Sequence, residues 1–180
     1  MSERSIILRD GEIRELLERG EVRVLRPIKS ELRSHSDGRK RRVFMRRDIL
    51  EVNELLSRRQ EHPLRRISCP AGTVGSRLWV REAWRFDGWT DEGEPWIRYA
   101  ADGRRRLREH VPPEWADRIT EIWASLSASA NIGEPARDSK WRPSIHMPRW
   151  ASRMSVTLSA VSVDPAGAGL AWAYQLKRVD

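Results

Sequence analysis

The residues best suited to bind a ligand lie close together between Trp141 and Arg153, where indole, guanidinium, imidazole and hydroxyl groups are packed around two prolines. Proline restricts the backbone on both sides of His146, so little conformational entropy is lost when a ligand docks. We expect the guanidiniums to neutralise phosphate, an indole to stack on a base, and a small polar group to contact a base edge. The candidates are Ser144, His146, Arg149, Trp150 and Arg153.

Each of these groups also has a purely structural interpretation. The tryptophans could plug the end of a barrel while the arginines are solvated. His146 could cap a turn, and Ser144 could satisfy a backbone amide. Met154–Val161 follows this loop with apolar and smaller residues in alternation, which predicts a half-buried strand.

A second candidate, Glu82, lies in the alternating run Arg77–Trp84, where Leu78 and Val80 share its face. A carboxylate among apolar neighbours is costly unless it is paired or hydrogen-bonded. Glu82 is therefore either the structural partner of an arginine or a carboxylate aimed into a pocket. Trp84, on the same face, is a second possible platform for a stacked base.

Arg26 and Lys29 form a third candidate group on the extended segment Glu21–Lys29, where they could contact phosphate or form the solvated side of an edge strand. If the protein is an enzyme, Glu82 is the expected base and Lys29 the electrostatic stabiliser. The basic run Gly38–Arg42 resembles a mobile loop that could hold a phosphate backbone without reading sequence.

The composition favours a nucleic-acid partner. The chain carries 34 Lys+Arg against 26 Asp+Glu, a net charge of +8, and most of the basic residues are arginine. Arginine suits bidentate phosphate contacts, and nine tryptophans supply surfaces on which bases can stack. A basic surface of no special purpose is the alternative. RNA, single-stranded nucleic acid or a nucleoside is the expected ligand.

Other features limit the class of protein. The lone Cys69 excludes an internal disulfide framework and a multi-cysteine zinc site, so we predict no metal and no cofactor. No apolar run approaches the length of a membrane span, and the N-terminus lacks a signal-peptide pattern. We therefore expect a soluble cytoplasmic protein with no membrane partner.

The remaining patterns predict short strands with few helices. We expect a first helix from an N-cap at Asp10 to Gly20, a second after Asp48, and a third opened by Pro112, with residues 85–110 loop-like around a strand at 96–100. The third helix carries a core stripe formed by Trp115, Ile119, Ile122, Trp123 and Leu126. Ser5–Leu8 is a short strand, and the strand after Arg153 forms a hairpin with Leu170–Val179. Such an arrangement favours a small barrel.

Three segments closely resemble the phage and prophage proteins of the ASCH domain family: Cys69–Trp84, Trp141–Arg153 and Trp172–Val179. The segment Glu12–Lys29 is similar to the opening of that family. The resemblance implies an α+β fold, a small PUA-like mixed β-barrel with flanking helices, as one domain over 1–180 with a variable insertion at about 85–140. It also implies a cleft that binds RNA or a modified nucleoside.

Some small ASCH proteins are amidohydrolases that deacetylate 4-acetylcytidine through a lysine and a threonine after the first helix and a later glutamate. In this chain Glu21 stands where the lysine is expected, and Val24 stands near the threonine position. Valine cannot act as a nucleophile, and a carboxylate cannot replace an ammonium that stabilises negative charge. The short turn Asp164–Gly169 also replaces the acidic helical segment of the family. These departures favour binding over an amidohydrolase or nuclease activity.

Overall fold

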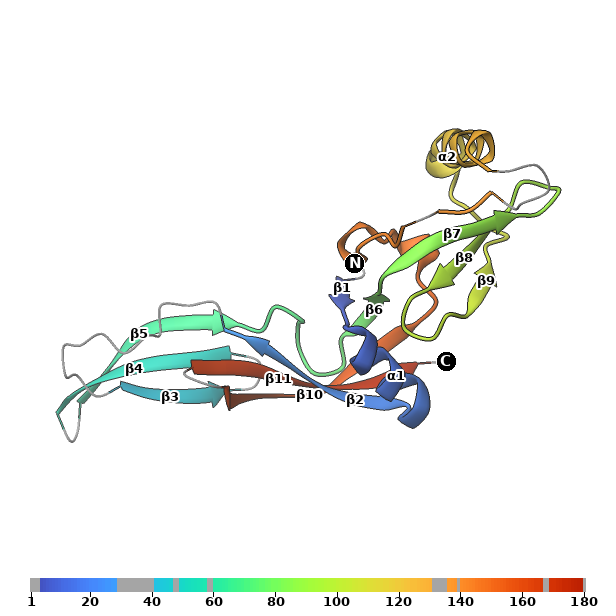
Figure 1. Cartoon of the computed structure of the whole chain (residues 1–180). Coiled ribbons are helices and arrows are strands. Elements are labelled where there is room, and N and C mark those ends of the chain that lie inside the picture. Colours follow the sequence, from blue (N-terminus) through green and yellow to red (C-terminus); the bar gives the residue numbers. More distant parts are fainter. Residues whose placement is uncertain are drawn as a thin grey trace. The chain divides into compact units, whose positions relative to one another are not determined.

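The computed structural model describes residues 4–28, 41–46, 49–57, 60–130, 136–138, 140–166 and 169–179, and it is an α+β protein (Figure 1). The chain divides into two compact units. Unit 1 comprises Met1–Arg4, Arg19–Leu78 and Ser155–Asp180. Unit 2 comprises Ser5–Glu18 and Trp79–Met154. It therefore contains the loop Trp141–Arg153, which we call the focal loop, and the whole of the expected insertion at about 85–140.

The first five-stranded sheet has the order β1-β6-β10-β11-β2. Its strands are β1 (Arg4–Ile7), β2 (Glu21–Pro27), β6 (Arg77–Arg81), β10 (Ser155–Ala166) and β11 (Gly169–Val179). The predicted hairpin of the last two strands is confirmed, because β10 and β11 pair antiparallel from Ser155↔Val179 to Ala166↔Gly169. The strand at the N-terminus and the extended segment after the first helix are confirmed as well.

The first helix, α1 (Asp10–Arg19), is confirmed, and it buries Ile13 and Leu16 on one face. Its start differs by one residue from the prediction, since Asp10 is already helical. The backbone N–H of Arg9 donates to Glu12 Oε2 at 2.8 Å, which is the reciprocal half of a capping box. Gly20 follows with φ 74, so the chain leaves the helix through the left-handed region that glycine tolerates.

The prediction of a helix after Asp48 was wrong. Its residues form β4 (Ile49–Ser57) in a second sheet of order β3-β4-β5, between β3 (Arg41–Arg46) and β5 (Gln60–Ser68). Pairing on both sides of β4 supplies hydrogen bonds that outweigh a local helical spacing of apolar residues. Pro63 lies in the edge strand β5, beside a register shift between Val52 and Asn53, where proline is tolerated. Residues 38–40 of the predicted basic loop lie outside the described residues, while Arg41 and Arg42 belong to β3.

Residues 85–110, predicted to be largely loop, contain a third sheet of order β7-β8-β9. Its strands are β7 (Trp84–Trp89), β8 (Pro95–Tyr99) and β9 (Arg105–Leu107), of which only β8 was predicted. The turn signals at Asp91–Pro95 and Asp102–Gly103 connect these strands, and Gly93 and Gly103 adopt φ 85 and φ 70 there. The sequence pattern was ambiguous because tryptophan occurs on both faces of this sheet, Trp84 on the core face and Trp96 on the other.

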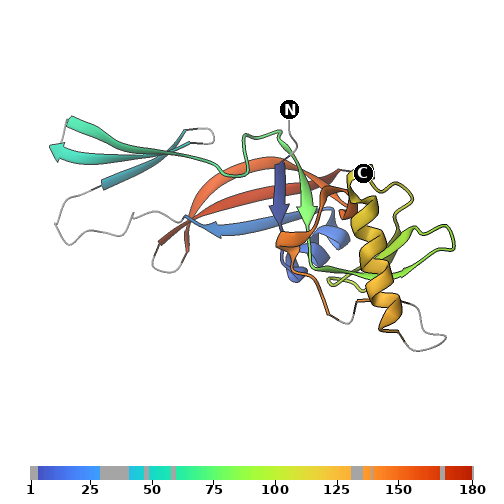
Figure 2. The ribbon, with the colours of Figure 1, turned by 90° about the horizontal axis from the view of Figure 1, so that it is seen from above.

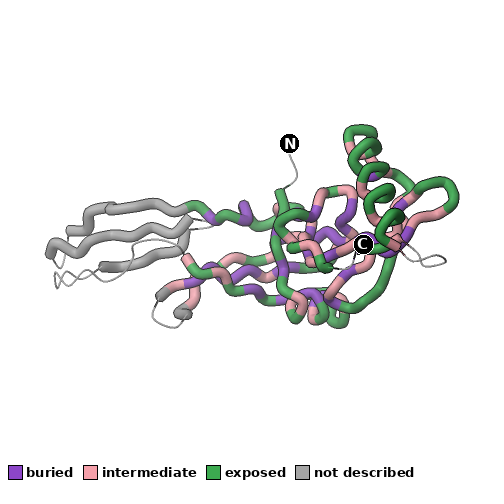
Figure 3. The backbone as a smooth tube through the Cα atoms, turned by 45° about the horizontal axis from the view of Figure 1, so that its top comes forward, coloured by how far each residue is buried: buried purple, intermediate pink, exposed green. Residues whose placement is uncertain are grey.

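The core of unit 2 lies between this third sheet and α2 (Ala116–Ala128), the helix that the sequence predicts to open at Pro112. The buried cluster consists of Trp84, Phe86, Ile97, Tyr99, Ile119, Met147 and Ala151. The 3-10 turn η1 (Pro113–Trp115) leads into α2, which is drawn in gold in Figure 2. Ile122 and Leu126 pack against the cluster beside Ile119, but Trp123 is 47% exposed, so the predicted core stripe is narrower than expected. Figure 3 shows α2 as mostly exposed.

The predicted closed barrel is not formed by the described strands. The first sheet ends at β1 and β2, the second at β3 and β5, and the third at β7 and β9, so each sheet keeps two edge strands. The predictions of the β10–β11 hairpin and of strands β1, β2 and β8 were correct, but they did not determine closure, which requires the last strand to pair with the first.

Candidate functional site

The focal loop of unit 2 consists of two successive 3-10 turns, η2 (Ser144–His146) and η3 (Arg149–Ala151). Each turn follows a proline whose φ, −58 for Pro143 and −77 for Pro148, matches the restricted range of its ring. The backbone N–H of His146 donates to Pro143 O at 3.0 Å. The turns leave Ile145 58% exposed, together with His146 and Arg149, while Ser144 is half-buried.

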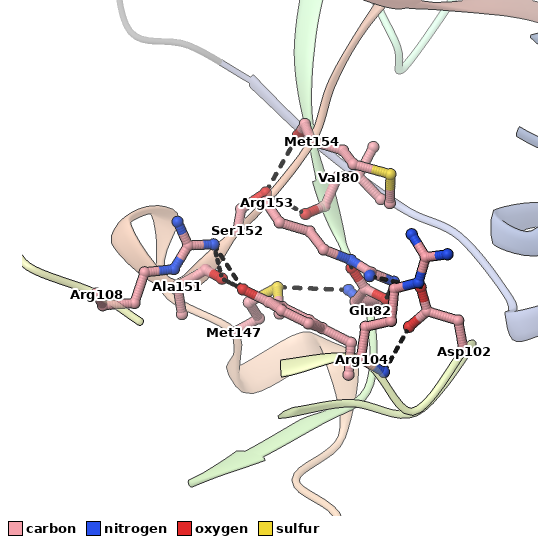
Figure 4. A network of polar contacts seen from close by, with 11 residues as sticks. Val80, Glu82, Asp102, Arg104, Arg108, Met147, Ala151, Ser152, Arg153 and Met154 are labelled. Carbon is pink, nitrogen blue, oxygen red and sulfur yellow. Dashed lines mark hydrogen bonds and ion pairs between the residues drawn. The ribbon is translucent and has the colours of Figure 1, made fainter. Parts of the chain in front are cut away.

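The base of the loop is anchored in the core of unit 2. Met147 and Ala151 are fully buried, and the Ser152 hydroxyl donates to Val80 O at 2.7 Å (Figure 4). The Tyr99 hydroxyl donates to Ala151 O at 2.8 Å. These contacts fix the two turns to β6 and to the third sheet, so the loop presents its exposed side chains from a rigid support.

Arg153, a predicted phosphate contact, is instead a buried structural residue. Its side chain is 5% exposed, and its Nε and Nη2 atoms donate to both oxygens of Glu82 at 2.8 and 2.9 Å. Its Nη1 donates to Asp102 Oδ2 at 2.8 Å, and its guanidinium lies 4.2 Å from the centroid of the Tyr99 ring. Figure 4 shows these groups converging beside β6. Arg153 therefore has carboxylate partners for three of its nitrogens.

The same ion pair gives Glu82 the first of its two predicted roles, that of a structural partner for an arginine. Glu82 is 1% exposed, shares its face with the buried Leu78 and Val80 as predicted, and has both oxygens bonded to one guanidinium. Burial raises the pKa of Glu82, and the hydrogen bonds and charge of Arg153 oppose this rise without cancelling it. A general base needs a free lone pair directed at substrate, and this carboxylate is directed at Arg153.

The pKa values of Arg153 and Asp102 shift in the directions that favour their charged forms. Burial acts to lower the pKa of Arg153, but its hydrogen bonds to Glu82 and Asp102 outweigh that effect and raise it. For Asp102, burial acts to raise the pKa, and the Arg153 hydrogen bond together with the Arg104 backbone N–H lowers it below 3.8. The network therefore holds Arg153 charged.

The two predicted stacking residues both serve packing. Trp84 is 3% exposed and meets Phe86 edge to face, with ring centroids 5.2 Å apart. Trp150 is half-buried and meets Trp84 and Trp115 edge to face, at 6.4 and 5.8 Å. Such pairs stabilise a core beyond their buried area. Trp84 thus belongs to the core, and Trp150 holds the loop against it.

The structure brings Arg149 together with two residues that the sequence interpretation missed. Trp79 lies under two guanidiniums, with Arg81 Cζ at 5.2 Å and Arg149 Cζ at 5.9 Å from its ring centroid. Arg81 Nη2 also donates to the carbonyl oxygen of Ile145, which links the strand to the exposed turn. We call Trp79, Arg81, Ile145, His146 and Arg149 the Trp79 surface. Alternation along β6 puts Trp79 and Arg81 on the face opposite Leu78 and Val80, and this was the signal that could have identified the surface.

The remaining predicted contacts belong to the other unit or outside the described residues. Arg26, in β2 of unit 1, is half-buried, and its Nη1 donates to Leu25 O at 3.0 Å. Lys29 lies outside the described residues. Its two predicted roles, as a ligand contact and as the electrostatic stabiliser of the enzyme alternative, are therefore not placed by the structure.

No protein-family model, curated protein or solved structure matches this chain. Membership of the ASCH family therefore stays a prediction from the sequence motifs. Across the described ranges no helix is long and apolar enough to cross a membrane. The same residues contain no group of three or more His, Cys, Asp or Glu side chains placed to hold a metal ion.

Proposed function

We propose that this protein is an RNA- or nucleotide-binding module of the ASCH type with a PUA-like fold, and that the Trp79 surface contacts the ligand. In this proposal Arg149 and Arg81 neutralise phosphate, and His146 or Ser144 contacts a base edge. A modified nucleoside is included in the ligand class. Arg26 and Lys29 remain proposed contacts through unit 1.

The observation that carries the proposal is the placement of two guanidiniums over one indole beside an exposed, rigidly anchored turn. Cation–π contact holds a guanidinium in a fixed orientation over the face of the ring. The anchoring by Met147, Ala151 and Ser152 means that the turn is already ordered before a ligand arrives. A preorganised cationic surface loses less entropy on binding than a flexible one does.

The enzyme alternative, an amidohydrolase acting on 4-acetylcytidine-like nucleosides or a nuclease, receives less support. Its expected base, Glu82, is buried and has both oxygens bonded to Arg153. Val24 stands near the position expected for the threonine nucleophile, and Glu21 stands at the position expected for the lysine ammonium. Val24 is fully buried, so it faces the core of unit 1.

The test is binding of a fluorescein-labelled RNA of about 12 nucleotides, a length within the span of a single binding surface, followed by fluorescence anisotropy. Wild type should bind more weakly as salt rises, with a slope of about −0.7 for each phosphate neutralised on a single strand. R149Q should weaken binding about fivefold and flatten that slope. The matched control is R118Q, which removes an exposed guanidinium that lies 5.4 Å from the ring centroid of Trp115 and does not belong to the Trp79 surface.

Equal losses from R149Q and R118Q would mean that only net charge matters, and the Trp79 surface would lose its assignment. A flat salt response would count against a nucleic-acid ligand altogether. Deacetylation of 4-acetylcytidine by wild type, abolished by Glu82→Gln, would instead support the enzyme alternative.

A further inference from the structure

The third sheet of unit 2 carries a row of three arginines straight across its strands. Arg85 on β7 pairs directly with Arg98 on β8, and Arg98 pairs directly with Arg105 on β9. Residues directly opposite each other in antiparallel strands project from the same face of the sheet. The neighbouring pair Phe86↔Ile97 is buried in the core, so the arginine row lies on the face directed away from that core.

One carboxylate from these strands accompanies the row. Asp87 accepts from Arg98 Nη2 at 2.7 Å, and its other oxygen lies 3.9 Å from Arg85 Nη2. Like charges directly opposite each other destabilise a sheet, and one carboxylate cannot neutralise three guanidiniums. The side chains of Arg85 and Arg98 remain 22% and 33% exposed, and Arg105 is exposed. The row is therefore a concentrated positive strip that an anion would stabilise.

Two indoles flank the strip. The guanidinium of Arg85 lies 4.7 Å from the ring centroid of Trp141, which is 42% exposed. The guanidinium of Arg105 lies 4.6 Å from the ring centroid of Trp96, which is half-buried on β8. Positive charge interleaved with flat aromatic surfaces is the combination that holds single strands, because phosphate meets the cations and unpaired bases stack on the rings.

We propose that the Arg85–Arg98–Arg105 row, with Trp96 and Trp141, is a binding surface for single-stranded nucleic acid. This inference rests on the proposed function and names the form of its ligand. A duplex could meet the charges, but its bases are already stacked on one another and cannot use the indoles. An acidic protein could likewise meet the charges without using either ring.

The experiment compares adjacent residues on one strand. R105Q removes the outermost arginine of the row, while R106Q removes an exposed arginine whose partner, Ile97, belongs to the core face. The probe is fluorescein-labelled oligouridine of about 12 nucleotides, with a duplex of equal length and polyglutamate as competitors. R105Q should weaken binding about fivefold and reduce the salt slope by about 0.7, and R106Q should leave both unchanged.

Stacking is tested separately by Trp96→Leu, which should weaken oligouridine binding at least fivefold, while Trp96→Phe keeps most of the affinity because it retains a ring. Thermal melting of both variants confirms that they fold. Equal effects of R105Q and R106Q, no difference between W96L and W96F, or competition by duplex or polyglutamate as strong as by oligouridine would each overturn the inference. If wild type binds no nucleic acid, the proposed function fails with it. If R105Q weakens binding and R149Q does not, the row is supported and the Trp79 surface is the part that fails.

Discussion

Replacing Arg153 by methionine should destabilise the protein strongly, because it removes the only charge that both oxygens of Glu82 contact among the described residues. Methionine retains an apolar chain of similar length, so the change removes the guanidinium with little loss of packing. Glu82 is 1% exposed and cannot regain water where it lies. Asp102 loses less, because it is more exposed and keeps the Arg104 backbone N–H at 3.1 Å.

Breaking a buried ion pair from one side typically costs about 3–5 kcal/mol. Protonation of the stranded carboxyl limits this penalty, since burial already raises the pKa of Glu82 and loss of Arg153 removes the groups that oppose the rise. We therefore expect a loss of about 3 kcal/mol at neutral pH, at the lower end of that range. For a chain of this size the loss corresponds to a fall in Tm of about 10 °C.

Tryptophan fluorescence during urea and thermal unfolding measures this effect in the correct unit, because eight of the nine tryptophans lie between Trp79 and Trp150 in unit 2. The double variant R153M/E82M should recover at least half of the lost stability, because both buried charges are then absent. A Tm of R153M within about 2 °C of wild type would refute the assignment of Arg153 to a buried pair. That result would instead support the prediction from the sequence that Arg153 is an exposed phosphate contact.

Three further predictions test other parts of the structure. Trp150→Ala should cost about 3 kcal/mol in urea unfolding, because the indole packs against two other tryptophans, and unchanged stability with lost RNA binding would make it a stacking platform instead. Gly72→Ala should destabilise the protein by about 1 kcal/mol or more, because the φ of Gly72 is 104 and a Cβ there would lie 2.7 Å from Ser76 Oγ. Gly11→Ala should instead stabilise α1 by about 0.5 kcal/mol, because no atom lies within 4 Å of the new Cβ. Equal effects of the two substitutions would contradict this account. The pKa of Asp102 is lowered from 3.8 in the folded state, so its ionised form stabilises the protein above that pH and the contribution is lost as pH falls through the folded value. The Tm difference between wild type and Asp102→Asn should therefore shrink as pH drops below about 3.8, and a constant difference would contradict it.

Local patterns predicted the elements whose hydrogen bonds or burial are set by nearby residues. Helix α1 has its cap, its apolar face and its terminating glycine within eleven residues, from Asp10 to Gly20. The alternation in the run Arg77–Trp84 correctly placed Glu82 with the buried Leu78 and Val80. The strands β10 and β11 follow each other closely in the chain, and they pair from Ala166↔Gly169 onward, so the register of the hairpin follows from the two strands themselves.

The features that could not be predicted depend on residues far apart in the chain. The residues Ile49–Leu56 have a helical spacing of apolar residues, but they form β4 because strands pair with it on both sides. No local sequence pattern predicts which strands will pair with it. The partner of Glu82 is 71 positions away, and the sequence offers thirty-four basic residues for the role. Among the focal-loop arginines, nothing local distinguishes Arg153, which is buried, from Arg149, which is exposed.

These two arginines show why composition alone cannot locate a binding surface in so basic a chain. The guanidinium of Arg153 is bonded to the carboxylates of Glu82 and Asp102 and contributes no field to the solvent that a ligand could use. Arg149 and Arg105 have the same side chain, but each lies on an indole at the surface of unit 2. A ring orients the guanidinium that lies over it but carries no opposite charge, unlike the two carboxylates bonded to Arg153. The buried ion-pair network therefore removes Arg153 from any ligand surface, which the net charge of +8 could not reveal.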